Sequence, residues 1–393
     1  MTAPSTFVAA ERMKTGRPYW LPLALFCLGH FFVDLYSGAL GTLQPVLLDR
    51  FRLSYTEAGI LGGALVFSSS VMQPVYGYLS DRLHSRLFAA LGPAMAGIFI
   101  STLGWASGYA ALLAMVVLGG AGIAAFHPQA AANAVAGVRR NRGRAMAVFS
   151  CSGSLGVAMG PLFFYALTRG GTLAHTPWGA LPGLATTALL LALMPPLAGR
   201  APHSAKFDWA PLRAVWKPMT VLYFLVVIRS VVQITFGQML PLYLHTQRNY
   251  SLSTASLCLA LYLIGGAVGG MAGGTLADRF GGRRVIMISM LGSTLLLALF
   301  VFGHGALSVA GLLLGGAILL FTIPVNVVMA QDLVPTQAGT VSALMMGFGW
   351  GVAGLIFIPL TGWVSDHFSM QWAFAGLIAF PLFGFLLAFR LPK

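Results

Sequence analysis

Apolar residues occur in twelve long runs that are separated by short polar segments. Most runs are close to the roughly 20 residues that a helix needs to cross a bilayer. The runs of the first half cover residues 20–48, 56–79, 87–107, 109–135, 144–168 and 178–198, and those of the second half cover 218–244, 253–277, 284–303, 306–331, 338–364 and 371–390. The pattern therefore predicts an all-α membrane protein with twelve transmembrane helices.

The composition excludes most soluble classes of protein. Of 393 residues, 58% are hydrophobic and only 8% are charged. A soluble domain carries roughly 25% charged residues, so this chain cannot cover a water-facing surface. Cys27, Cys151 and Cys258 lie within or at the edge of apolar runs without the spacing of a metal site, and the chain has no HExxH or GxSxG motif. These features argue against an enzyme and against a bound metal or cofactor.

The net charge of +14 raises the question of nucleic-acid binding. Lys and Arg fall in the short segments between apolar runs, where such residues set membrane topology. With the N-terminus inside, 18 of the 23 basic residues lie in cytoplasmic segments, four lie outside, and Arg229 lies within a run. The asymmetry predicts a multi-pass protein of the inner (cytoplasmic) membrane, with both termini in the cytoplasm and no nucleic-acid partner.

An internal repeat relates the two halves of the chain. The segment Gly77–Arg82 recurs as Gly274–Arg279, and Pro128 in the fourth run corresponds to Pro324 in the tenth. Such parallel repeats are typical of transporters whose substrate site lies between the halves near the midplane of the bilayer. The predicted parts are an N-terminal six-helix half at residues 1–199, a cytoplasmic linker at 200–217 and a C-terminal six-helix half at 218–393.

The repeated loops resemble the signature that the major facilitator superfamily carries between its second and third helices. The resemblance implies two pseudo-symmetric six-helix bundles and transport by alternating access. It also implies a conformational latch in the two loops, made by Gly77, Asp81, Arg82, Gly274, Asp278 and Arg279. An ordinary basic loop with a turn glycine is the alternative, but the occurrence of the motif at both corresponding positions favours a latch.

A narrower resemblance rests on five further segments. They are His30–Asp34, Phe126–Gln129, Ala330–Pro335, the glycine-rich Gly347–Gly354 and the Asp366–His367 that follows it. Together they resemble the fosmidomycin resistance protein family, which comprises proton-driven efflux proteins of the bacterial inner membrane. This chain departs from that family at Gln129, where an acid is usual. The fifth run carries part of a drug-exporter signature, in which Gly156, Gly160 and Pro161 would form a helix hinge.

Asp34 lies about fifteen residues into the first run, or roughly 22 Å along a helix. An acid at that depth costs on the order of 3 kcal/mol on insertion scales, so such residues usually face a cavity and function there. His30 lies one turn earlier on the same helix face and has an ordinary pKa near neutrality. We predict that Asp34 and His30 couple transport to protons. The alternatives are a static ion pair for Asp34 and a packing role for His30.

Arg229 lies within the seventh run, which is the repeat partner of the first. It is therefore expected at a depth comparable to that of Asp34, in the opposite half. A guanidinium group matches phosphonate or carboxylate geometry through paired hydrogen bonds. We predict that Arg229 binds an anionic substrate, and the alternative is a charge-compensating bridge to Asp34.

Several other polar side chains also lie within apolar runs. They are Gln233, His127, Gln129, Asn133, Asn326, Gln44 and Gln73. Polar side chains in membrane helices either line a cavity or join helices, and the second role is commoner for any one of them. We predict substrate contacts for this group, with two or three members lining the cavity. His127 precedes a proline, so capping of a free carbonyl is its alternative role.

The sequence thus predicts a secondary active transporter that uses the proton gradient, without a cofactor, to export a small anionic drug or metabolite such as a phosphonate. Uptake or exchange of a small organic anion by the same fold is the alternative. A membrane enzyme or sensor is disfavoured, because the sequence shows no catalytic motif and no appended soluble domain. The expected partners are a small-molecule substrate and the lipid bilayer, and the expected state is a monomer.

Overall fold

The structure is a computed structural model that describes residues 20–83, 85–134, 138, 142–168, 171–194, 210–337, 341–342 and 344–391. Every regular element within these residues is a helix, as predicted. In the described chain, eleven helices are long and apolar enough to cross a membrane. The remaining predicted span, which is the third along the chain, corresponds to α6, which is apolar but has only 15 residues.

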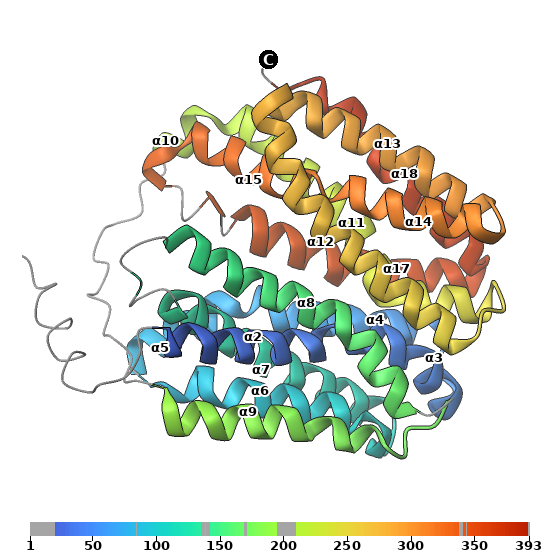
Figure 1. Cartoon of the computed structure of the whole chain (residues 1–393). Coiled ribbons are helices and arrows are strands. Elements are labelled where there is room, and N and C mark those ends of the chain that lie inside the picture. Colours follow the sequence, from blue (N-terminus) through green and yellow to red (C-terminus); the bar gives the residue numbers. More distant parts are fainter. Residues whose placement is uncertain are drawn as a thin grey trace, which may run out of the picture.

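The N-terminal half contains the first six spans (Figure 1). Its helices are α2 (Leu21–Ser37), α3 (Ala39–Phe51), α4 (Tyr55–Val66), the π-helical turn η1 (Phe67–Val71), α5 (Gln73–Leu83), α6 (Leu87–Ser101), α7 (Tyr109–Ala134), α8 (Arg142–Thr168) and α9 (Ala180–Leu193), with short 3-10 turns at Leu103–Trp105 and Thr176–Gly179. The first span consists of α2 and α3, which meet at Gly38. The second consists of α4, η1 and α5.

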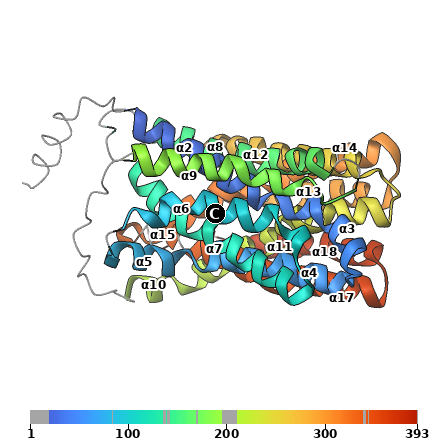
Figure 2. The same ribbon diagram turned by 90° about the horizontal axis from the view of Figure 1, so that it is seen from below.

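The C-terminal half contains the other six spans. Its helices are α10 (Ala210–Ala214), α11 (Trp216–Thr246), α12 (Leu252–Phe280), α13 (Gly282–Phe302), α14 (Gly305–Leu319), α15 (Thr322–Leu333), the turn η4 (Pro335–Gln337), the π-helical turn η5 (Leu344–Phe348), α17 (Gly349–His367) and α18 (Met370–Ala388). The tenth span consists of α14 and α15, and the eleventh of η5 and α17. Figure 2 shows that the spans of both halves run roughly side by side along one direction.

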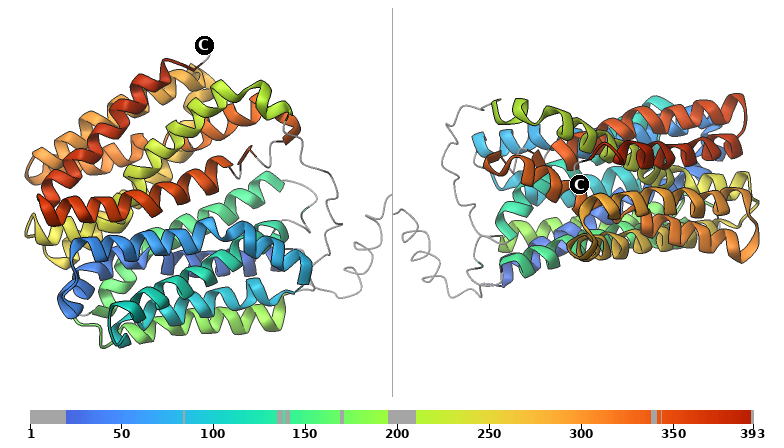
Figure 3. Two further views of the ribbon diagram at one scale, coloured as in Figure 1. Left: turned by 180° about the vertical axis from the view of Figure 1, so that it is seen from behind. Right: turned by 90° about the horizontal axis from the view of Figure 1, so that it is seen from above.

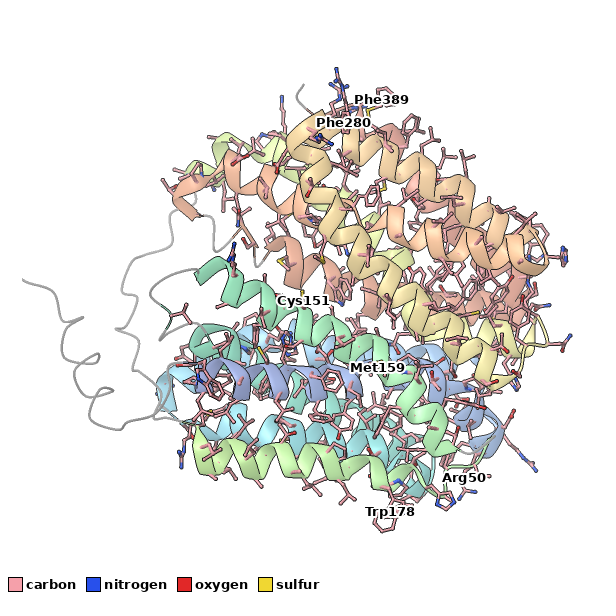
Figure 4. All side chains as sticks on the ribbon, in the orientation of Figure 1. Arg50, Cys151, Met159, Trp178, Phe280 and Phe389 are labelled. Atoms are coloured by element: carbon pink, nitrogen blue, oxygen red, sulfur yellow. The ribbon has the colours of Figure 1, made fainter. Side chains whose placement is uncertain are left out.

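Each half forms its own helical bundle around its own apolar core. One core lies within the N-terminal half, and it includes Phe26, Tyr36, Phe126 and Phe164. The cores of the C-terminal half are built mainly from its own helices. The outer surface is also apolar, as a lipid-facing surface must be. Met271, Leu295 and Phe383 are all more than 60% exposed, and Figure 4 shows apolar side chains around both bundles.

The repeat that the sequence shows has a counterpart in packing. Gly77 on α5 faces Pro128 on α7, and Gly274 on α12 faces Pro324 on α15 in the same way. A methyl group at either glycine would make ordinary van der Waals contact with the ring of that proline. The glycine that begins each repeated loop motif therefore packs on the proline of its own half.

The two halves meet at the end of the bundle opposite to residue 20 and residue 391, which is called the far end below. Packing between the halves runs mainly through α3 on α11, α4 on α17, and α8 on α12. Helices α5 and α15, at the other end, take no part in this extensive packing. Figures 1 and 3 show that the ribbons of the two halves converge at the far end and lie farther apart at the opposite end.

Glycines allow this close approach. The missing Cβ of Gly41 would overlap the backbone carbonyl of Gly237, and that of Gly362 would overlap the carbonyl of Tyr55. A side chain at these positions would hold α3 away from α11 and α17 away from α4. Small residues serve the same purpose generally in membrane proteins, where helix association depends on close packing.

Asp366 closes the far end with hydrogen bonds across the two halves. Its carboxylate oxygens accept the backbone N–H groups of Tyr55 and Thr56, each at 2.8 Å, and the Thr56 hydroxyl at 2.5 Å. These N–H groups begin α4 and have no partner within that helix. The next N–H, from Glu57, is bonded to the Ser54 hydroxyl within a capping box. A carboxylate of the C-terminal half thus completes the N-terminal cap of a helix in the other half.

Removing this cap should favour separation of the far end. We expect Asp366→Ala to shift the ratio of closed to open molecules about tenfold toward open, because a charged acceptor of three hydrogen bonds contributes on the order of 1.4 kcal/mol or more. Spin labels at the exposed positions Arg50 and Leu307, one on each half, would report a longer-distance population. Asp49→Asn, which changes an exposed acid at the end of α3 that makes no hydrogen bond to the other half within the described residues, should leave the distances unchanged. An unchanged distribution in Asp366→Ala would contradict the role of the cap.

Candidate functional site

The predicted proton-coupling pair forms a three-residue cluster with His127. His30 and Asp34 lie one turn apart on α2, and His30 Nε2 is 3.2 Å from Asp34 Oδ2. His127 on α7 reaches the other carboxylate oxygen, with Nε2 3.2 Å from Oδ1. One carboxylate is thus held between two imidazole rings in the interior of the N-terminal half. This group of His30, Asp34 and His127 is called the histidine–aspartate cluster below.

The second nitrogen of each ring is bound to the backbone. His30 Nδ1 lies 2.8 Å from the carbonyl oxygen of Phe149 on α8. His127 Nδ1 lies 2.8 Å from the carbonyl oxygen of Ile123, one turn earlier on its own helix. The ring of His30 also stacks on Phe149, with centroids 4.2 Å apart. These contacts fix both rings so that their Nε2 atoms point at Asp34.

Gly153 of α8 makes room for the cluster. A Cβ atom at this position would overlap both His30 Nε2 and Asp34 Oδ2. Helix α8 packs closely on α2 along this line, since Cβ atoms at Gly156 and Gly160 would meet the backbone carbonyls of Phe31 and Leu35. The glycines of the exporter-like signature therefore serve as close-packing positions between α8 and α2. Whether they also act as the predicted hinge stays a prediction.

Gly153→Ala should disturb the cluster without removing any of its groups. The added methyl group must displace the imidazole or the carboxylate, so we expect a loss of about 1–3 kcal/mol of stability from overpacking. Transport driven by a pH gradient should fall as well. The matched control is Gly376→Ala in α18, where a Cβ meets nothing within 4 Å and the helix should gain stability. Thermal unfolding of both variants measures the difference, and equal melting temperatures would contradict the assignment.

The three side chains also have a spacing that a metal ion could accept, because their ligand atoms all lie within 4.8 Å of one another. Both imidazole–carboxylate contacts, however, are at hydrogen-bond distance. Hydrogen bonding between the three groups accounts for the geometry by itself. The sequence-based expectation of no cofactor stays a prediction.

The second candidate site surrounds Arg229 in the C-terminal half. Arg229 lies in the middle of α11 and is 3% exposed. One guanidinium nitrogen donates to the side-chain oxygen of Gln233, one turn later on the same helix. The indole ring of Trp350 on α17 lies 5.6 Å from the guanidinium carbon. Tyr262 on α12 is close enough for its hydroxyl to interact electrostatically with Arg229.

This buried cation has no anionic partner among the described residues. The ion pairs of the described chain are those between Asp34 and the two histidines. Arg229 Nε and the hydroxyl of Tyr262 also have no hydrogen-bond partner there. An uncompensated buried charge is costly, so an arrangement of this kind is typical of a site that receives an anion.

Asp34 and Arg229 do not pair in this structure. The carboxylate of Asp34 is engaged by the two histidines of its own half, while the guanidinium of Arg229 contacts Gln233 and Trp350. The charge-compensating bridge that the sequence left open is therefore absent from this conformation. The two buried side chains are instead held separately, one in each half.

The other predicted substrate contacts have varied positions. Gln129 accepts a hydrogen bond from the N–H of Ala89 and donates to the carbonyl of Ser85, so it joins α7 to the start of α6. Asn133 and Gln73 donate to carbonyls one turn earlier on their own helices. These three side chains are engaged with the backbone of the N-terminal half. Sequence spacing gave no sign of this, because the carbonyls that they bind become available only at helix ends and irregular turns.

Gln44 and Asn326 are buried without complete hydrogen bonding. Gln44 donates to the carbonyl of Ala58 at 3.2 Å, and its oxygen has no partner. Asn326 on α15 is 0% exposed, and neither atom of its amide has a partner in the described chain. Of the predicted amides, Gln233 thus contacts Arg229, and Asn326 keeps a free hydrogen-bonding capacity in the same half.

Of the predicted latch residues, those whose side chains the structure describes make no ion pair with one another in this conformation. Arg82, Asp278 and Arg279 are exposed, and no ion pair involves them in the described residues. The side chain of Asp81 lies outside the described part of the structure. These loops lie at the end where the halves diverge, so a latch there would form only when that end closes.

Sequence reasoning missed several residues that now matter. Trp350 lies within the glycine-rich eleventh span, and its position over Arg229 could be recognised only from the packing of α17 on α11. Tyr262 and Gly153 gave no signal beyond their occurrence within apolar runs. Asp366 was noted only as part of a family resemblance, and its partners lie in the other half.

Comparison with known proteins places these features in a family. The chain is 28% identical to the uncharacterised MFS-type transporter YfnC of Bacillus subtilis, over 97% of this chain and 95% of that protein. It is 26% identical to the fosmidomycin resistance protein of Escherichia coli, over 98% of this chain and 96% of that protein. The latter similarity agrees with the resemblance noted in the sequence.

Solved structures share the fold at low sequence identity. An inward-facing, occupied bacterial homologue of the human lysosomal transporter Spinster has a TM-score of 0.80 at 15% identity, covering 95% of this chain and 97% of that chain. A variant of the nucleoside transporter NupG has a TM-score of 0.79 at 15% identity, covering 94% and 98%. The sequence model of the Major Facilitator Superfamily matches residues 26–346 and 222–393. The chain is thus a membrane transporter, not an enzyme, and it belongs to the Major Facilitator Superfamily.

Proposed function

We propose that this transporter exports a small organic anion in exchange for protons. The observation that carries the proposal is the separation of two buried functional charges. In the C-terminal half, Arg229 offers a buried guanidinium that has no carboxylate partner among the described residues. The histidine–aspartate cluster offers groups that bind and release protons in the N-terminal half. A transporter that couples an anion to protons needs both.

The topology that Lys and Arg predict gives this conformation a direction. If residue 20 and residue 391 lie on the cytoplasmic side, the far end that Asp366 closes is the outer side of the inner membrane. The conformation is then inward-facing, and the sites would be reached from the cytoplasm. Alternating access would next separate the far end and bring the loops of Gly77–Arg82 and Gly274–Arg279 together.

A phosphonate or carboxylate is the substrate class that Arg229 favours, since its planar donors match such groups. Fosmidomycin is a suitable first probe, because a relative that aligns over nearly the whole chain is named for resistance to it. The export direction is supported by that relative and by the partial exporter signature on α8, which contains Gly156, Gly160 and Pro161.

One observation favours a second candidate, which is uptake of an anion together with protons. Protonation of the cluster adds positive charge to an interior that already contains Arg229. By Coulomb's law this favours binding of an anion at the same time, as in a symporter. An exporter instead requires a conformational change that prevents simultaneous binding.

Inside-out membrane vesicles decide between the two. Their lumen corresponds to the outer side, so an acid lumen should drive fosmidomycin into vesicles that contain the transporter. A panel with methylphosphonate, acetate and a neutral sugar tests the substrate class. Accumulation only in right-side-out vesicles with an acid exterior would establish uptake. Transport that ignores the pH gradient in both preparations would refute proton coupling.

A further inference from the structure

The contacts of the two histidines with backbone carbonyls determine where their protons lie. The carbonyl oxygens of Phe149 and Ile123 can only accept hydrogen bonds. His30 Nδ1 and His127 Nδ1, each 2.8 Å from one of them, must therefore carry a hydrogen. In a neutral ring only one nitrogen is protonated. Both Nε2 atoms would then present lone pairs to Asp34 in their neutral form.

An ionised carboxylate also only accepts hydrogen bonds. With Asp34 ionised and both rings neutral, two lone pairs would face two carboxylate oxygens at 3.2 Å. Such contacts are repulsive, and the observed arrangement would not persist. Each Nε2–oxygen contact therefore requires one proton between its two atoms. Because a carboxyl group holds only one proton, at least one ring must be an imidazolium when both contacts are hydrogen bonds.

We propose that the histidine–aspartate cluster is a two-proton carrier, in which His127 holds the second proton, because its side chain is more exposed than that of His30 and a charge there costs less desolvation. The inference rests on the proposed proton coupling and extends it to the number of protons per cycle. The cluster then changes between a net charge of +1 with both protons and −1 with neither. Loss of the protons removes the attraction between α2 and α7 at Asp34, so protonation is linked to helix packing.

Among the described side chains, none around the cluster would take over either proton. Helix α2 packs against α3, α6, α7, α8 and α9, and in the described chain α6 and α9 contribute no titratable side chain. The other titratable side chains that the structure describes on α2 and its neighbours are Cys27, Tyr36, Asp49, Arg50, Tyr109, Arg144, Cys151 and Tyr165. None of these makes an ion pair with Asp34 in the described chain.

A matched pair of variants separates the two contacts of His127. His127→Asn keeps a side-chain N–H near the position of Nδ1, where it donates to the Ile123 carbonyl, and it removes the proton-binding nitrogen. His367→Asn is the control, because His367 Nδ1 makes the same contact with a carbonyl one turn earlier, 2.9 Å away, without a carboxylate. Asp34→Asn provides the reference without coupling.

The first measurement needs no substrate. Solid-state nuclear magnetic resonance of the full chain in lipid, with 15N-labelled histidine rings, reports which ring nitrogens are protonated, and His30→Asn and His127→Asn assign the signals. Both Nδ1 atoms should be protonated, and at low pH at least one of the two rings should be an imidazolium with the other Nε2 hydrogen-bonded. An unprotonated Nδ1 in either ring would overturn the proposal.

The second measurement counts protons in proteoliposomes at zero membrane potential. The fosmidomycin concentration ratio at equilibrium should change by an additional factor of about ten per unit of imposed pH difference in wild type compared with His127→Asn, because one more proton is coupled. Ionisation of fosmidomycin depends on pH in the same way with both proteins, so it does not contribute to the difference between them. If wild type and His127→Asn have equal slopes that are both steeper than the slope of Asp34→Asn, one proton moves per cycle. That result would overturn the two-proton inference and leave the proposed proton coupling standing. A wild-type slope equal to that of Asp34→Asn would overturn the proposed coupling as well. If fosmidomycin is not transported, the nuclear magnetic resonance measurement of the histidine rings decides whether the two-proton inference holds.

Discussion

Asp34→Asn should abolish the response of transport to a pH gradient. Asparagine has the size of aspartate and its N–H can donate to one of the two Nε2 atoms, but its amide does not bind a proton. We expect accumulation of fosmidomycin in acid-loaded inside-out vesicles to fall roughly 100-fold or more, since gradient energy can no longer be transferred. Exchange of labelled for unlabelled fosmidomycin, which needs no net proton movement, should continue.

The matched control for this prediction is Asp49→Asn. Asp49 is an exposed acid at the end of α3 and lies outside the cluster. The Asp49→Asn variant should leave both accumulation and exchange unchanged. Full accumulation in Asp34→Asn would remove the proton role from the cluster. Loss of exchange together with accumulation would instead indicate damage to the substrate site or to the fold.

Arg229→Lys should weaken substrate binding strongly. A lysine retains the charge but cannot make paired hydrogen bonds to one phosphonate or carboxylate. The loss of about 2–3 kcal/mol of charge-assisted hydrogen bonding corresponds to roughly a 30- to 150-fold rise in the concentration needed for half-maximal exchange. The neutral Arg229→Gln should fail to bind the anion. Its melting temperature should not fall, because an uncompensated buried cation is removed.

Arg248 is an informative contrast. Its guanidinium donates to the Tyr243 hydroxyl and to the carbonyls of Phe300, Val301 and Gly303. We therefore expect Arg248→Lys to lower stability while leaving the half-maximal concentration nearly unchanged. The same substitution at Arg229 should do the opposite. If both variants lose stability and neither changes binding, Arg229 has a structural role.

The two sites are linked through the helices that hold them. His30 is anchored to Phe149 on α8, and α8 packs on both α2 and α12. Tyr262 of α12 interacts electrostatically with Arg229. A change in the contact between α2 and α8 would therefore reach the C-terminal half through α12. This route would connect the proposed proton site with the proposed anion site, and the variants of Gly153 and His127 test its first step.

The sequence alone determined the parts that depend on local pattern. Span positions follow from runs of apolar residues, because each must shield its own backbone from lipid by forming a helix. The pairing of His30 with Asp34 follows from their spacing of one helical turn, and the structure contains it. The repeat between the halves was visible in Gly77 and Gly274, and each faces the corresponding proline in its half.

Only the tertiary structure decided what depends on contacts between distant helices. It brought His127 to Asp34, left Arg229 without a carboxylate, and placed Trp350 beside it. It also bonded several amides to backbone carbonyls and joined Asp366 to the start of α4. Sequence spacing specifies which face of a helix a residue occupies but not which helix lies opposite. Partners in an apolar interior are therefore set by packing, since a polar group there bonds to whatever the neighbouring helix presents.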